Sequence, residues 1–74
     1  MSLNSEEYLL KTLAEYNEEI GRLEEQEPSG ELIEALANRG NVLNMLELYS
    51  SSLDDLKYAA ALTEEIETDP GTFI

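Results

Sequence analysis

The sequence predicts an all-α fold of three antiparallel helices, and three observations support this prediction. Apolar residues recur at helical spacings of three and four along most of the chain. No segment alternates apolar and polar residues with the period of two that marks a strand. Two short segments rich in proline, glycine or serine divide the apolar pattern, and connections this short favour antiparallel neighbours. We therefore expect one small helical domain over residues 1–74, with helices at about 5–26, 30–48 and 52–68.

The first predicted helix has a capping sequence and a long apolar stripe. Asn4 precedes two glutamates, and acidic residues in a first turn complement the helix dipole. The apolar positions then follow each other by four, three, four and three: Leu9, Leu13, Tyr16, Ile20 and Leu23. Tyr8 and Leu10 widen this face. The segment Pro28-Ser29-Gly30 should end the helix.

The second predicted helix starts at a serine cap and contains a glycine. Ser29 is the cap, and the apolar face consists of Leu32, Ile33, Leu36, Leu43 and Leu46. Gly40 lies between these positions. Because glycine within a helix costs about 1 kcal/mol relative to alanine, we expect a second helix to approach closely at Gly40.

The third predicted helix follows the serine run at residues 50–52. Ser52 with Asp55 three residues later matches a capping arrangement, which places the start of the helix near Ser52. Its apolar positions are Leu53, Leu56, Ala59, Ala60, Thr63 and Ile66, and Asp69-Pro70-Gly71 should close it. Ser52, Ala59 and Ala60 are small residues available for contact with Gly40.

Composition excludes several classes of function. Seventeen acidic residues against four basic ones give a net charge of −13, which repels phosphate backbones and anionic lipid. We therefore expect no nucleic-acid or membrane partner. The chain has neither cysteine nor histidine, so it lacks a thiolate nucleophile and an imidazole for metal binding or proton transfer. A cytoplasmic protein is compatible with this composition. We expect no catalytic residue, metal or cofactor.

Two groups of carboxylates present an alternative to that expectation. The first contains Glu15, Glu18 and Glu19, and the second contains Glu64, Glu65 and Asp69. Oxygen ligands of this kind hold magnesium or calcium, so a subunit of a magnesium-dependent hydrolase is one hypothesis. A solvated run of charges accounts for the same residues without any ion. The serines at residues 50–52 have no histidine to activate them as nucleophiles, which favours a capping role.

The apolar stripe of the first helix also predicts self-association. If the stripe packs on the other two helices, Tyr8 and Leu10 stay partly exposed, and a second copy of the chain would cover them. The residues assigned to this homo-oligomeric contact are Tyr8, Leu9, Leu10, Leu13 and Tyr16. A purely structural oligomerisation domain is therefore an alternative function.

The glycine-centred pattern resembles the tetratricopeptide repeat (TPR) family. With Gly40 as the small residue of that family's first helix, its small, large and small positions of the second helix match Ser52, Leu56 and Ala59. Residues from about Glu31 to Asp69 would then form one repeat, and the preceding helix would resemble the end of another. The chain departs from the family at Arg39, where leucine is usual.

The resemblance implies a non-catalytic adaptor or small regulatory protein, standing alone or as part of a longer repeat array. Family members bind a peptide or a helix in a groove lined by first helices. Carried over to this chain, the groove residues are Glu34, Ala37, Asn38, Asn41, Asn44 and Met45. The acidic surface favours a protein or peptide partner of basic or mixed charge. The simpler interpretation of the same residues is a solvated polar face.

Overall fold

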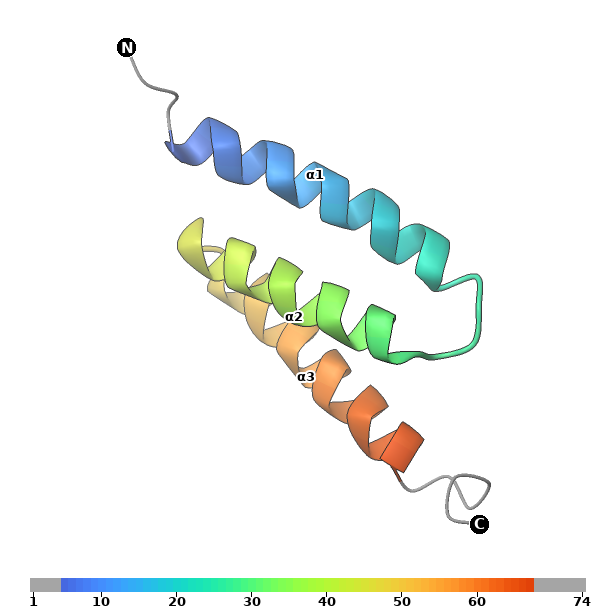
Figure 1. The fold of residues 1–74 in the computed structure, drawn as a ribbon. Coiled ribbons are helices and arrows are strands. Elements are labelled where there is room, and N and C mark those ends of the chain that lie inside the picture. The colour runs from blue at the N-terminus through green and yellow to red at the C-terminus, as the bar shows by residue number, and fades with distance from the viewer. Residues whose placement is uncertain (1–4, 68–74) are drawn as a thin grey trace.

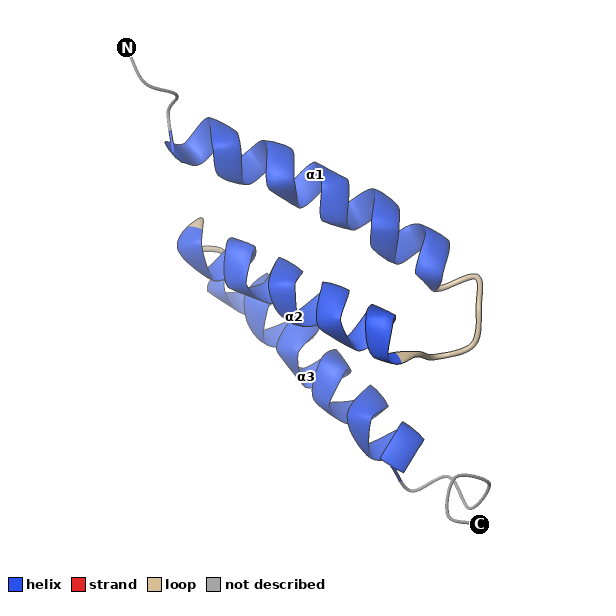
Figure 2. Cartoon of the chain, in the orientation of Figure 1, coloured by secondary structure: helices blue, strands red, loops and turns tan. Residues whose placement is uncertain are grey.

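The structure is a computed structural model, and it describes residues 5–67. It contains three helices, α1 (Ser5–Leu23), α2 (Gly30–Met45) and α3 (Tyr49–Glu67). Successive helices run in opposite directions, and α2 lies between the other two (Figure 1). Short loops join the helices, and residues 5–67 contain no strand (Figure 2). The predicted all-α fold of three antiparallel helices is confirmed.

The connection between α1 and α2 matches the sequence prediction closely. The amide of Leu32 donates to the hydroxyl of Ser29 at 3.3 Å, so the predicted cap of α2 is confirmed. Helix α1 ends at Leu23, three residues before the predicted end at residue 26, and a turn follows in which Gln26 N–H donates to Leu23 C=O at 3.1 Å. The predicted cap at Asn4 and the closing segment Asp69-Pro70-Gly71 lie outside the described residues.

The turn between α2 and α3 differs from the prediction. Helix α2 ends at Met45 rather than at residue 48, because Glu47 adopts the left-handed conformation with φ of 64°. Leu48 N–H donates to Leu43 C=O at 2.9 Å, and Glu47 N–H donates to Asn44 C=O at 3.0 Å. These two bonds form a Schellman motif, which usually carries glycine at the left-handed position. Because glutamate and not glycine is at that position, the sequence does not indicate that α2 ends at Met45.

The predicted cap at Ser52 is wrong. Helix α3 begins at Tyr49, so Ser52 lies within the helix, where it is only 4% exposed. Its hydroxyl donates to the carbonyl of Gly40 at 2.7 Å, and Asp55 binds Arg39 instead of a helix end. A spacing of three residues marks a capping box, but it equally places two side chains on one face within a helix. Ser52 and Asp55 both face α2.

The predicted close approach at Gly40 is confirmed. A Cβ atom on Gly40 would lie 3.0 Å from Leu56 Cδ2 and 3.4 Å from the carbonyl oxygen of Ser52. Ala59 is also buried, whereas Ala60 is exposed. The missing side chain of Gly40 therefore gives room to the Leu56 side chain and brings the backbone of α3 close to α2.

The hydrophobic core occupies the half of the bundle next to the α1–α2 loop. It contains Ile20 and Leu23 from α1, Leu32, Ala35 and Leu36 from α2, and Ala59 and Leu62 from α3. At the other end of the bundle, Val42 and Leu43 of α2 are buried, but Leu9, Leu13 and Leu46 are only half-buried, although they occupy apolar positions. Packing is therefore more complete at one end of the three helices than at the other.

Candidate functional site

The residues predicted to bind a partner lie along one face of α2. Glu34, Asn41, Asn44 and Met45 are exposed, and Asn38 is half-buried. Their spacings of three, four and seven place them on neighbouring turns of the same side of the helix. We call these five residues the polar face of α2. Neither α1 nor α3 covers its four exposed members, so the central helix of the bundle presents amide and carboxylate groups to solvent.

The polar face of α2 borders a hollow between α1 and α2. The lining of this acidic hollow consists of Glu19, Leu23, Glu31, Glu34, Ala35 and Asn38. Arg22 lies 3.9 Å from Glu19 in an exposed ion pair, which contributes little to stability. Within residues 5–67 no three or more acidic residues gather closely enough to hold a metal ion. A cationic side chain of a binding partner would meet three carboxylates in this hollow, those of Glu19, Glu31 and Glu34, next to the apolar side chains of Leu23 and Ala35.

A second hollow lies at the opposite end of the α1–α2 pair. This apolar hollow is lined by Ser5, Glu6, Leu9, Leu10, Met45, Leu46, Glu47 and Leu48. Leu10 is 48% exposed and Met45 is 65% exposed. The sequence assigns Leu10 to self-association and Met45 to partner binding, so the structure unites residues from two separate predictions.

The predicted self-association residues do not form one continuous surface. Leu9 and Leu10 line the apolar hollow, whereas Tyr16 packs against the hydrophobic core. Tyr8 and Leu10 are both exposed, but they are two positions apart and so point about 200° apart around the helix. Leu13 is half-buried. A contact on one side of α1 that covers Leu10 therefore does not also cover Tyr8.

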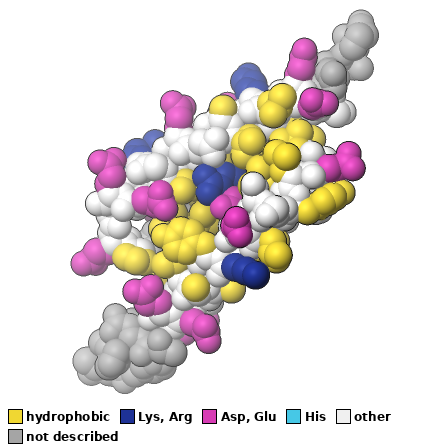
Figure 3. Space-filling view, turned by 180° about the vertical axis from the view of Figure 1, so that it is seen from behind, with side chains coloured by type: hydrophobic (Ala, Val, Ile, Leu, Met, Phe, Trp, Pro, Cys, Tyr) yellow, Lys and Arg dark blue, Asp and Glu magenta, His cyan; other side chains and the backbone are white. Residues whose placement is uncertain are grey.

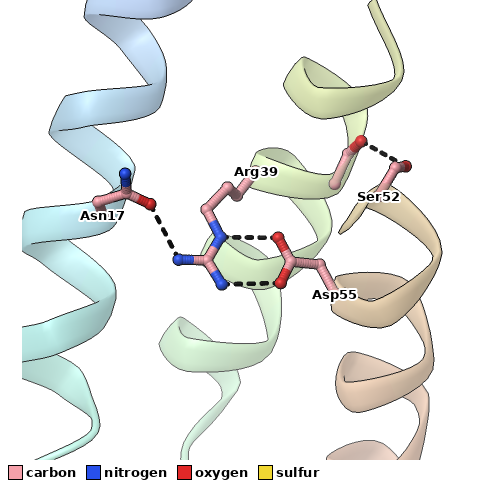
Figure 4. A network of polar contacts seen from close by, with 5 residues as sticks. Asn17, Arg39, Ser52 and Asp55 are labelled. Carbon is pink, nitrogen blue, oxygen red and sulfur yellow. Dashed lines mark hydrogen bonds and ion pairs between the residues drawn. The ribbon is translucent and has the colours of Figure 1, made fainter. Parts of the chain in front are cut away.

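A network of polar contacts centred on Arg39 links all three helices (Figure 4). The guanidinium group of Arg39 donates from Nε and NH2 to the two carboxylate oxygens of Asp55, at 2.6 and 2.7 Å. Its third nitrogen, NH1, donates to the side-chain oxygen of Asn17 at 3.0 Å. Fork-to-fork bonding of this kind is among the stronger polar interactions in proteins. Arg39 thus fixes α1 and α3 relative to α2.

The pairing changes the acid–base properties of Arg39. The hydrogen bonding of the Arg39 guanidinium to the Asp55 carboxylate, which accepts, raises the pKa of Arg39 above its usual value, and this effect exceeds the opposing effect of burial. A raised pKa means that the stabilising contribution of the charged form is complete at all pH values below the unfolded-state pKa. It is lost only as pH rises through the higher folded-state value. Arg39 therefore remains charged and links the helices. Its Nε and NH2 groups already donate to the carboxylate of Asp55.

The Arg39 network lines a cleft between α1 and α3. Leu13, Asn17, Arg39, Leu43, Ser51, Asp54 and Asp55 form its walls and floor. On the face seen in Figure 3, hydrophobic side chains gather in the middle, and acidic side chains lie mostly around the border. The sequence gives no signal for this cleft, because Asn17, Arg39 and Asp55 are far apart along the chain.

No family model, no curated protein and no solved structure matches this chain. None of the helices within residues 5–67 combines the length and the apolar character that crossing a bilayer requires.

Proposed function

We propose that this protein is a non-catalytic protein-interaction module that binds a peptide or helix of basic or mixed charge along the polar face of α2. One observation carries the proposal. The central helix leaves Glu34, Asn41 and Asn44 exposed on a side that neither neighbouring helix covers. Amide groups hydrogen-bond the backbone of a peptide, and the carboxylates of the adjoining acidic hollow attract its cationic side chains.

We propose further that the α2–α3 hairpin is TPR-like. Burial of Ser52 and Ala59 on the side of α3 that faces Gly40 supports this assignment, as does the position of Leu56 over Gly40. An adaptor role requires no catalytic group, metal or cofactor. We propose a cytoplasmic location for the protein. The absence of cysteine, and hence of disulfides, is compatible with that location.

Selection of random 12-residue peptides on the immobilised protein tests the binding function without a known partner. We expect the enriched peptides to contain lysine or arginine, because the acidic hollow contains Glu19, Glu31 and Glu34. Substitution Glu34→Lys should weaken their binding by at least about tenfold, which corresponds to about 1.4 kcal/mol.

Glu18→Lys is the matched control, because it makes the same charge change at an exposed position of α1 that does not line the hollow. It should alter affinity by less than about threefold, through long-range electrostatics alone. Enriched peptides without cationic residues, or equal losses in the two variants, would show that the polar face of α2 is not the binding surface.

A further inference from the structure

The end of the bundle farthest from the α1–α2 loop has an incomplete hydrophobic core. The core cluster includes no residue of α1 before Ile20 and no residue of α2 after Leu36, and beyond it Val42 and Leu43 of α2 are buried without a fully buried partner from α1. Apolar side chains continue beyond it, but Leu9 and Leu46 are half-buried and Leu10 is 48% exposed. Exposed apolar groups that line a hollow are typical of an interaction site.

The apolar hollow and the Arg39 cleft follow one another along the same helices. Leu9 lines the first and Leu13 lines the second, one turn further along α1. Leu46, which directly follows α2, and Leu43 of α2 are related in a similar way. Together the two depressions extend along α1 from Ser5 to Asn17, which corresponds to about 18 Å of helix at 1.5 Å per residue. A length of about three helical turns suits an amphipathic helix with three apolar anchors.

The charge around this surface selects the kind of occupant. Glu6 and Glu47 border the apolar hollow, and within residues 5–67 no lysine or arginine lines it. Asp54 borders the cleft, where Arg39, the one cation among the described lining residues, is bonded to Asp55. A second copy of the chain would bring another net charge of −13 to an acidic border. A partner helix with lysine or arginine beside its apolar stripe instead places opposite charges together.

We propose that the apolar hollow and the adjoining cleft bind an amphipathic helix of another protein, with its apolar stripe on Leu9, Leu10 and Leu13 and its cationic flanks at Glu47 and Asp54. This surface goes beyond the polar face of α2, with which it shares only Met45. It completes the core at the open end of the bundle. The sequence alone favours a second copy as the cover of Leu10, whereas the acidic border favours a cationic partner helix, and self-association is the competing outcome of the test.

The test uses an 18-residue helical peptide with leucines at positions i, i+4, i+7 and i+11 and lysines on both sides of this stripe. A second peptide of identical composition has its leucines spread around the helix. Fluorescence anisotropy measures the binding of each to the whole chain. We expect the striped peptide to bind at least about tenfold more tightly than the scrambled one. Leu10→Gln should abolish most of this difference.

Leu53→Gln is the matched control, because Leu53 is 52% exposed and lines neither depression. It should change the affinity of the striped peptide by less than about twofold, and circular dichroism should show both variants folded. Equal binding of the two peptides, or equal losses in the two variants, would overturn the proposal. So would sedimentation showing a dimer that Leu10→Gln converts to monomer, since a second copy would then be the occupant. Glu34→Lys tests the polar face independently of these outcomes.

Discussion

The Arg39–Asp55 pair provides the most demanding test of how the three helices are held together. The side chains of Arg39 and Asp55 are 23% and 10% exposed, so the pair lies at the edge of the buried region. Two unit charges about 4 Å apart attract each other by about 4 kcal/mol at an effective dielectric constant of about 20, before the cost of desolvation is subtracted. Removal of one partner leaves the other charge in a place where water solvates it poorly.

We predict that Arg39→Met destabilises the protein by about 3 kcal/mol and Asp55→Leu by about 2 kcal/mol. The double variant should lose only about 2 kcal/mol, because it leaves no charge unpaired and places apolar groups in contact. The interaction energy of the cycle is then about 3 kcal/mol, the upper part of the range for neighbouring residues. Asn17→Ala removes only the weaker contact to NH1 and should cost less than about 1 kcal/mol.

Urea unfolding followed by circular dichroism at 222 nm measures these differences. A chain of this size has a slope of about 1 kcal/mol per molar urea, so Arg39→Met should shift the midpoint downwards by about 3 M. If the effects of the two single substitutions add to within about 0.5 kcal/mol in the double variant, the two side chains do not interact in solution. That result would refute the assignment of Arg39 as the clamp between α2 and α3.

Three further predictions concern the packing of α2 against α3. Glu47→Gly should stabilise the protein by about 1 kcal/mol, because glycine adopts the left-handed conformation without steric cost. Glu47→Gln removes the charge but keeps the strained backbone, so it should have little effect. Thermal unfolding of both variants shows whether charge or backbone strain is the cause. Gly40→Leu should cost about 1 to 3 kcal/mol through overpacking against Leu56 despite leucine's higher helix propensity, and a higher melting temperature than the parent's would rule out the close contact. Ser52→Ala should cost about 1 kcal/mol by removing the bond to the Gly40 carbonyl, and chemical denaturation showing no loss would mean that this bond contributes nothing.

The sequence predicts those features of the fold that depend on neighbouring residues. The stripe of α1 and the serine cap of α2 are local patterns, and both lie where periodicity and capping rules place them. Gly40 also carried enough information to predict a close approach, because a glycine in a helix needs a compensating contact. The same rules failed at the α2–α3 turn. Glu47 adopts the left-handed conformation, a position at which most helix ends have glycine, so the local sequence does not mark the end of α2.

The surfaces depend on contacts between distant residues, and the sequence predicts less of them. The polar face of α2 follows from helical spacing alone, and the structure leaves it uncovered. The acidic hollow joins Glu19 of α1 to Glu31 and Glu34 of α2, which requires the relative positions of two helices. Arg39 looks like an isolated cation in the sequence. Only the packing of α3 shows that Asp55 faces it.

The contact between Gly40 and Leu56 is the one on which the α2–α3 hairpin depends, and nuclear Overhauser spectroscopy measures it directly. The structure places the side chain of Leu56 against the backbone of Gly40. We therefore predict strong cross-peaks between the Gly40 Hα protons and the Leu56 methyl groups, accompanied by cross-peaks from Gly40 to Ser52. Absence of these cross-peaks in a folded sample, with the Gly40 protons close to water alone, would contradict the packing of α3 on α2 described above.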